Sequence, residues 1–259
     1  MTSIPFFQVD AFAERPLTGN PAAVMPLERW LDDALMQAIA AENNLAETAF
    51  TVAVDGDDAD FHLRWFTPTV EMKMCGHATL ASAHILLRGE RVRFATLSGV
   101  LTVSRNGDLL ELDMPAAPVA PERLPELLSA LGTEGETFIS RKGNGNAIVL
   151  LADESAVRAV RPDFAALAAL PYLVSITAPG DEHDVASRVF AACYGVPEDP
   201  VTGSAHTAIV PFWAERLGRN EFTALQASQR TGLLQCRMAG DRVILGGHCH
   251  TVIAGQFQL

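Results

Sequence analysis

Alternating apolar and polar positions recur in two distant parts of the chain, each time around a short turn. Residues 98–114 read SGVLTVSRNGDLLELDM, and residues 231–247 read TGLLQCRMAGDRVILGG. Each segment has a glycine, seven further residues and then Gly-Asp, with alternating runs on both sides of the turn. Alternation flanking such a turn is typical of two antiparallel strands. The pattern therefore predicts two β-hairpins.

The hairpins belong to a longer internal repeat. GHATLASAHILL begins at Gly76, and GSAHTAIVPFWAERL begins at Gly203, 127 residues later. Gly-Asn occurs at Gly19 and again at Gly145, 126 residues later, and the two hairpins lie 133 residues apart. Three matches in the same order at nearly one spacing indicate a duplicated α+β unit.

The segments that begin at Gly76 and Gly203 are rich in alanine and other small residues. A helix that is small or apolar on most of its faces is buried rather than amphipathic. We therefore expect each half to be a set of strands around a central helix. The first half is placed at residues 1–115 and the second at 116–259, with a crossover of the last strand to the first half left open.

Two outer helices are expected as well. Apolar residues recur at helical spacing over residues 30–39, and a second helix is predicted over residues 121–131, where Gly132 ends it. Residues 115–121 are rich in proline and alanine, which indicates a linker between the halves.

The composition is that of a globular protein. Of the 259 residues, 49% are hydrophobic and 19% are charged, which is enough to bury a large core. The formal net charge of -12 disfavours binding to nucleic-acid phosphates or anionic membranes. No basic leader and no apolar run of about eighteen residues is found. We expect a cytoplasmic protein that binds neither nucleic acid nor membrane.

The two inner helices also suggest where chemistry takes place. The free N–H groups and the dipole of a helix N-terminus favour a bound carboxylate. His77 lies at the start of the first inner helix, where its imidazole could transfer protons near neutral pH. Asp199, Thr202 and Ser204 lie at the start of the second. A capping or core histidine, and a turn or capping aspartate, are the alternative interpretations.

Two further side chains are candidates for acid/base work. Glu47 lies between the first outer helix and a strand, where a carboxyl group is either exposed or turned inward. If Glu47 faces inward, it suits general acid/base catalysis. Cys75 precedes the first inner helix and is either a thiolate base activated by the helix start or a small core residue.

Metal and cofactor sites are not expected. The four cysteines form no CxxC pair, which argues against a disulfide framework and a zinc knuckle. His248 and His250 have no third ligand at a useful spacing. The sequence also has no dinucleotide fingerprint, Walker loop or nucleophile elbow.

Taken in order, seven segments of the chain resemble the PhzF-like family of phenazine-biosynthesis proteins. They read VDAF, GNPAAV, NLAETAF, WFTP, CGHAT, EDPVTGSAH and QASQR, and lie at residues 9–12, 19–24, 44–50, 65–68, 75–79, 198–206 and 226–230. The matches cover nearly the whole chain. The resemblance implies the α+β diaminopimelate-epimerase fold, in which two pseudo-symmetric halves, each a strand barrel around a central helix, enclose the site.

The resemblance also implies an activity. A family member of this kind is an isomerase that shifts a proton on a small carboxylate without a cofactor, and it forms a homodimer. Glu47 would be the general acid/base, with His77 and Asp199 as further catalytic groups. The substrate contacts would be Asn20, Gly76, Thr202, Gly203 and Ser204.

Two other functions remain open. Related racemases use two cysteines, whereas this chain has Cys75 at the first position and Thr202 at the second. Single-thiol relatives resemble hydroxyproline dehydratases, so an amino-acid lyase that uses Cys75 is the enzymatic alternative. Glu47 argues against the lyase, and Lys73 beside the turn could change the charge preference for substrate. The other alternative is a binding protein without turnover.

Overall fold

The structure, a computed structural model, describes residues 3–56, 58–142 and 145–259. Contacts among the residues divide the chain into two compact units. Unit 1 comprises Met1–Asp113 and Gly246–Leu259, and unit 2 comprises Met114–Leu245. Both units combine helices with mixed strands, which confirms the predicted α+β class.

The first unit begins with strands and carries two helices. Its elements in chain order are β1 (Ser3–Ala11), β2 (Asn20–Leu27), α1 (Asp33–Asn43), β3 (Glu47–Ala53), β4 (Phe61–Phe66), β5 (Glu71–Met72), α2 (Gly76–Leu86), β6 (Arg91–Thr96), β7 (Gly99–Asn106), β8 (Leu109–Pro115) and finally β18 (Cys249–Gln258).

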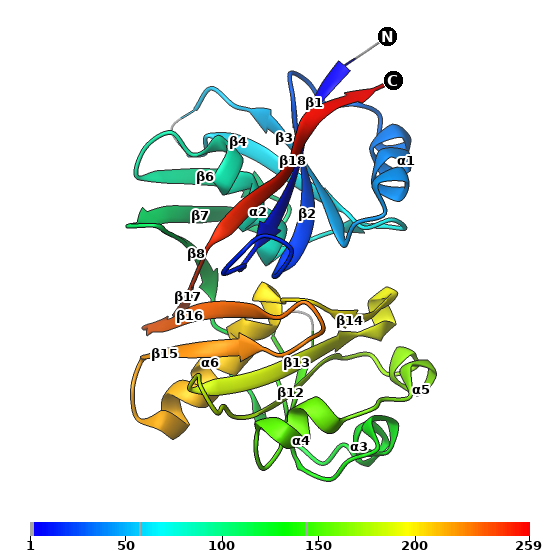
Figure 1. Cartoon of the computed structure of the whole chain (residues 1–259), viewed down its shortest axis with the longest axis vertical. Coiled ribbons are helices and arrows are strands. Elements are labelled where there is room, and N and C mark those ends of the chain that lie inside the picture. Colours follow the sequence, from blue (N-terminus) through cyan, green and yellow to red (C-terminus); the bar gives the residue numbers. More distant parts are fainter. Residues whose placement is uncertain (1–2, 57, 143–144) are drawn as a thin grey trace. The chain divides into compact units, whose positions relative to one another are not determined.

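The strands of unit 1 surround α2 (Figure 1). β2 runs antiparallel to β1 and parallel to β3, and β18 pairs with β1 along its whole length. α2 packs against β1, β2, β3, β7 and β18, and every residue from Gly76 to Ala83 is buried. The buried hydroxyls of Thr79 and Ser82 donate to carbonyls one turn earlier in the same helix, so they need no water. The prediction of an inner helix of small residues is confirmed.

The second unit has the same kinds of element with more helices. They are β9 (Ala120–Pro121), α3 (Pro125–Leu131), β10 (Glu136–Ile139), β11 (Asn146–Leu150), α4 (Glu154–Ala159), α5 (Phe164–Ala168), β12 (Leu173–Pro179), β13 (Val185–Ala191), the 3₁₀ helix η1 (Ala192–Tyr194), β14 (Val196–Asp199), α6 (Gly203–Leu217), β15 (Glu221–Gln226), β16 (Gly232–Ala239) and β17 (Arg242–Gly247).

Strand pairing repeats from one unit to the other. In unit 1, β2 is parallel to β3, β3 is antiparallel to β4, β4 is parallel to β6, and β6 is antiparallel to β7. In unit 2, β11, β12, β13, β15 and β16 follow the same sequence of parallel and antiparallel pairs. α6 packs against β11, β12 and β16. The duplication read from the sequence is therefore present in the topology.

One arginine in each unit ties a central strand to the segment that leads to the inner helix. The guanidinium of Arg64 donates two hydrogen bonds to Glu71, at 2.7 and 2.8 Å, and lies 5.2 Å from the Phe66 ring centre. Arg188 donates two bonds of 2.8 Å to Glu198 and lies 5.1 Å from the Phe190 ring centre. Bidentate pairing to a carboxylate fixes direction as well as distance. Both segments are held in the same way.

Outer helices cover the other face of the strands in each unit. In unit 1, Met36 and Ile39 of α1 pack with Met25 and Phe50 of the strands. In unit 2, α3, α4 and α5 contribute to a cluster with alternate residues of β12, whose remaining residues face the other way. Thr177 on that other face accepts a hydrogen bond from the Trp213 indole of α6 at 2.9 Å. These strands are therefore buried on both faces, as their apolar runs require.

A proline lies in the middle of α6. Pro211 has no N–H to donate to the carbonyl of Thr207, which is the usual helical acceptor at that position. The N–H of Ala117 donates to this carbonyl instead, at 2.9 Å. The segment around Ala117 is thereby attached to the inner helix of its own unit.

Two helices begin later than predicted. The helix expected from residue 30 begins at Asp33, because Trp30 and Leu31 pack against the α1 cluster from an extended segment. The helix expected over residues 121–131 begins at Pro125, a residue whose fixed φ and missing N–H suit the first helical position. Residues 115–121, expected to be a linker, contain the end of β8 and the short strand β9.

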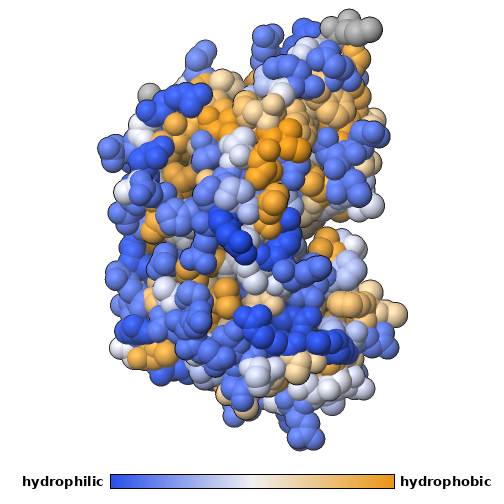
Figure 2. Space-filling view, in the orientation of Figure 1, coloured by the Kyte–Doolittle hydropathy of each residue, from blue (hydrophilic) through white to orange (hydrophobic). Residues whose placement is uncertain are grey.

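The surface is mainly hydrophilic on the face shown in Figure 2, with apolar side chains in scattered patches. Leu17 and Leu97 are among the exposed large apolar residues. Within the described residues, no helix is both long enough and apolar enough to cross a membrane.

Gly19 provides a test of how tightly the strands close. Its φ is +68°, and a Cβ placed on it would lie 2.3 Å from the carbonyl oxygen of Ala11. Gly107, in the first hairpin, has φ +59° but open space around it. We predict that Gly107→Ala lowers the free energy of unfolding by about 1 kcal/mol through backbone strain, and Gly19→Ala by about 2–4 kcal/mol because a clash is added. Urea unfolding of both variants measures this, and equal losses would contradict the packing described.

Candidate active site

Four polar or thiol side chains meet at the first turn of α2 in unit 1. Glu47 is the first residue of β3 and Asn20 the first of β2, and these strands are parallel with Ala22 opposite Glu47. Cys75 caps the N-terminus of α2 in an extended conformation, and His77 is the second residue of that helix. Two adjacent parallel strands and a helix start therefore bring together residues that are distant in the sequence.

The central contact joins an imidazole and a carboxylate. Nε2 of His77 lies 3.1 Å from Oε2 of Glu47, and the side chains are 4% and 14% exposed. This separation is that of an ion pair, although the orientation in the structure falls short of a directed hydrogen bond. Glu47 thus faces inward, which is one of the two orientations that the sequence left open.

The second nitrogen of His77 faces two different groups. Nδ1 lies 3.2 Å from Nδ2 of Asn20 and 3.6 Å from Sγ of Cys75. Asn20 and Cys75 are buried, as is His77 itself. The imidazole is therefore held on both edges, by the carboxylate on one side and by the amide and thiol on the other.

Charge and burial act in opposite directions at this cluster. Burial lowers the pKa of His77, but Cys75 and Glu47 raise it, and the net direction is well above the ordinary value. For Cys75, burial and the charge of Glu47 raise the pKa of the thiol, and His77 offsets only part of this. A raised thiol pKa disfavours the thiolate base that the sequence left open for Cys75.

Among the described residues of unit 1, the same cluster brings together three side chains of metal-binding type. Ligand atoms of Glu47, Cys75 and His77 all lie within 4.8 Å of one another. A metal, however, needs lone pairs that converge on one point. The ring nitrogen near Cys75 is Nδ1, and the one near Glu47 is Nε2, so the imidazole would have to turn to bring all three ligands to one ion.

In unit 2, the segment before α6 is fixed by a glutamine and a serine. The Thr202 hydroxyl donates to the Asp199 carboxylate at 2.5 Å, and the Thr202 N–H donates to the side chain of Gln226 at 2.8 Å. The Gln226 amide and the Ser228 hydroxyl both donate to the Asp199 carbonyl, at 2.7 and 3.1 Å. The loop therefore presents Asp199 in one orientation.

The first turn of α6 follows directly. Gly203 is its first residue and is buried, whereas Ser204 is half-buried. His206 is fully buried, and its Nδ1 lies 2.8 Å from the Thr202 carbonyl, to which it donates as a neutral ring. Burial lowers the pKa of His206 to about 4. The Asn146 amide reaches this turn as well and donates to the Ser204 carbonyl at 3.4 Å.

The predicted site residues thus form one cluster in each unit. In unit 1 these are Asn20, Glu47, Gly76 and His77, and in unit 2 they are Asp199, Thr202, Gly203 and Ser204. Sequence reasoning missed two residues that shape the clusters, Asn146 and Gln226. The Gly-Asn repeat could have drawn attention to Asn146, since it matches Asn20.

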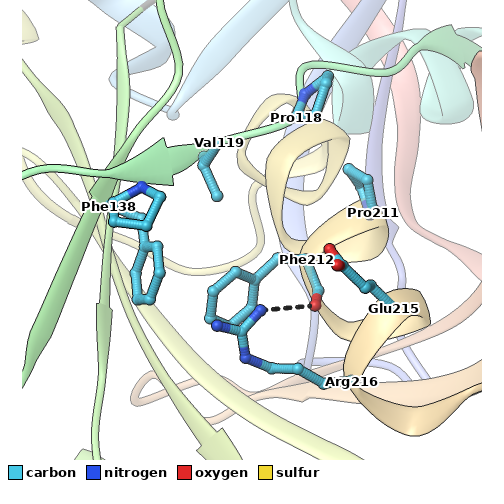
Figure 3. A pocket seen from close by; sticks show the side chains of 8 residues that line it. Pro118, Val119, Phe138, Pro211, Phe212, Glu215 and Arg216 are labelled. Atoms are coloured by element: carbon cyan, nitrogen blue, oxygen red, sulfur yellow. Dashed lines mark hydrogen bonds between the residues drawn. The ribbon is translucent and has the colours of Figure 1, made fainter.

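A cavity of about 310 Å³ lies in unit 2 (Figure 3). It is lined by Pro118, Val119, Pro121, Phe138, Pro211, Phe212, Glu215 and Arg216. The guanidinium carbon of Arg216 lies 3.5 Å from the Phe212 ring centre, and Nη1 donates to the Phe212 carbonyl. The Arg216 guanidinium is thus already bound to Phe212, and the residues that line the cavity include no nucleophile. It is not a candidate catalytic site.

Comparison with known proteins gives consistent matches over the whole chain. The sequence profile of the family described as "Phenazine biosynthesis-like protein" matches residues 9–255. An "uncharacterized isomerase" of Pseudomonas aeruginosa is 48% identical, over 99% of both chains. The crystal structure of a PhzF family protein from Enterococcus faecalis superposes with a TM-score of 0.92 at 42% identity, covering 100% of both chains.

A more distant structure shows how far the fold extends. A hydroxyproline epimerase from Agrobacterium vitis is 13% identical with a TM-score of 0.59, covering 98% of this chain and 92% of that one. At this identity the likeness concerns the fold alone. With the matches above, it confirms the diaminopimelate-epimerase-like fold predicted from the sequence.

His206 gives a pH-dependent test of the α6 turn. Its folded pKa of about 4 lies below the unfolded value of 6.5, so the unfolded chain binds a proton first as the pH falls. The stabilisation is complete above pH 6.5 and is lost between about 6.5 and 4. We predict that the wild type loses about 2–3 kcal/mol more than His206→Gln between pH 7 and pH 4.5. Urea unfolding at both pH values measures this, and parallel losses would contradict it.

Proposed function

Since this chain belongs to the PhzC-PhzF family of phenazine biosynthesis-like proteins, we propose that it is an isomerase that shifts a proton within a small carboxylate without a cofactor. Relatives from Pseudomonas aeruginosa and Halalkalibacterium halodurans are named uncharacterized isomerases, which supports an isomerase without naming its reaction. Glu47 is the group that takes and returns the proton.

One observation carries this assignment. The Glu47 carboxylate is turned inward, 14% exposed, and lies 3.1 Å from a buried imidazole. A carboxyl group with this exposure can be reached by substrate, and an imidazole beside it can exchange protons with it. An exposed structural glutamate would lack the buried imidazole beside it.

The reaction balances with these residues alone. The Glu47 carboxylate removes a proton from a substrate carbon, so a C–H bond breaks and an O–H bond forms. The electron pair moves into the conjugated system of the substrate carboxylate. The Glu47 carboxylic acid then protonates a different carbon of the same system, which restores the carboxylate and leaves an isomer. No bond is oxidised or reduced, and no co-reactant is consumed.

His77 supports this cycle by proton exchange with Glu47. Its Nε2 is the nitrogen near the carboxylate, and its pKa is raised by the charges around it despite burial. An imidazole of this kind can donate to Glu47 while the carboxylate is charged. For unit 2, we propose that Asp199 takes part in proton transfer and that Ser204 binds substrate.

We predict that Glu47→Gln lowers proton exchange at carbon by at least about 1,000-fold, because the amide cannot accept the proton. The assay incubates the protein in heavy water with dihydroaromatic carboxylic acids and cyclic amino acids, and follows deuterium incorporation by NMR. Glu42→Gln, an exposed site on α1, is the matched control and should keep wild-type exchange.

The same assay separates the alternatives. Cys75→Ser should retain most of the exchange, because the thiol is not the proposed base. Exchange that survives Glu47→Gln but is abolished by Cys75→Ser would favour the lyase. No exchange by the wild type with any compound would favour a binding protein.

Asp199→Asn tests the assignment in unit 2. The amide can still accept from the Thr202 hydroxyl, so the loop should keep its geometry while the negative charge is lost. We predict a fall in kcat of roughly 100-fold with an unchanged melting temperature. Steady-state kinetics and thermal unfolding check this, and a variant with wild-type kcat would remove Asp199 from the proposed machinery.

A further inference from the structure

The contacts of Asn20 differ from the role that the sequence suggested for it. Asn20 was expected to bind substrate, yet its side chain is fully buried and Nδ2 lies 3.2 Å from Nδ1 of His77. An amide NH2 donates hydrogen bonds and does not accept them. In this orientation Nδ1 of the neutral ring is the acceptor, and the ring proton is on Nε2. Nε2 is the nitrogen that lies 3.1 Å from Glu47.

The internal repeat offers a comparison for this contact. Asn146 occupies the matching position in unit 2, and each asparagine begins a strand and follows a glycine with positive φ, +68° and +66°. Asn146 donates to the carbonyl of Ser204, the second residue of α6, and Asn20 contacts the side chain of His77, the second residue of α2. In both units the asparagine joins the strand start to the same position of the inner helix.

From this we infer that Asn20 is a positioning residue that holds the neutral His77 ring in the tautomer with its proton on Nε2, directed toward Glu47. In unit 2 the equivalent amide bonds to backbone and has a structural effect only. In unit 1 the side chain at the second helical position is an imidazole, so the same amide determines which nitrogen carries the proton. The thiol of Cys75, 3.6 Å from Nδ1, acts in the same direction when it donates.

The tautomer matters because a carboxylate accepts hydrogen bonds and cannot donate them. With the proton on Nε2, the ring donates toward Oε2 of Glu47. With the proton on Nδ1, a nitrogen lone pair would face the carboxylate, and the two groups would repel. The catalytic meaning of this inference rests on the proposed function, but the tautomer is a property of the substrate-free protein above the pKa of His77 and can be measured without a substrate.

The test uses Asn20→Asp, which replaces the NH2 donor with an acceptor of nearly the same shape. Asn146→Asp is the matched control, because it places the same change at the same position of the repeat. Histidine labelled with ¹⁵N and two-bond ¹H–¹⁵N correlation spectra distinguish the two tautomers and the charged ring. The His77→Gln variant identifies the His77 signals.

We expect the neutral His77 ring of the wild type, observed above its pKa, to carry its proton on Nε2. In Asn20→Asp the proton should move to Nδ1, or the ring should stay charged to a higher pH. Asn146→Asp should destabilise the fold to a similar degree while leaving the His77 signals unchanged. Turnover in Asn20→Asp should show a kcat at least about 100-fold lower with KM changed by less than about threefold.

Either of two spectroscopic results, or one kinetic result, would overturn the inference. The spectroscopic results are a neutral wild-type ring with its proton on Nδ1 and spectra of Asn20→Asp that match the wild type. The kinetic result is a rise in KM alone in Asn20→Asp, which would make Asn20 a substrate contact after all. If the wild type turns over no compound, the proposed function fails, and the NMR spectra still decide the role of Asn20.

Discussion

Helix α2 is buried on every side over its first two turns, and a polar group buried against it costs free energy unless it has a partner. Thr79 and Ser82 meet this condition within the helix, by bonding to its own carbonyls. At the N-terminus the helix has free N–H groups and no preceding turn, so polar side chains from neighbouring strands can enter there. Glu47 enters there from β3 and lies beside His77, which belongs to the first turn of the helix itself. The burial of α2 therefore already favours its N-terminus as the place where polar side chains from the strands approach this helix, independently of any catalytic role.

The duplication shows what is architectural in this arrangement and what is particular to one unit. Both units share an arginine bound by two hydrogen bonds to a glutamate, an asparagine directed at the inner helix, and the order of parallel and antiparallel strands. They differ at the second residue of that helix, which is His77 in unit 1 and Ser204 in unit 2. A buried imidazole beside a carboxylate can carry its proton on either ring nitrogen or share it with the carboxylate. A serine hydroxyl at the same position has no such choice. The same scaffold therefore supports two different local chemistries.

The sequence was informative wherever the physical cause is local. Hairpins follow from alternation around a turn, and the inner helices from runs of small residues, so both could be predicted. Trp30 continued the helical spacing but packs from outside α1, because apolar spacing records burial and not backbone conformation. The inward orientation of Glu47 depends on the register of β2 against β3, and the bracing role of Gln226 depends on contact with a loop 24 residues earlier. Such pairings leave no periodic pattern, and for Glu47 the residues left the exposed and the inward orientation open, while the family resemblance favoured the catalytic role.

Pro211 also bears on how the second half of the chain could exist by itself. Ala117 belongs to no strand or helix, yet it supplies the N–H that the carbonyl of Thr207 lacks because of that proline. A fragment that began at β9 would contain every strand that packs on α6 and would still leave an interior acceptor unsatisfied, at a cost of about 1–3 kcal/mol. Because of a residue in the middle of a helix, the segment upstream of β9 therefore contributes to the stability of this half.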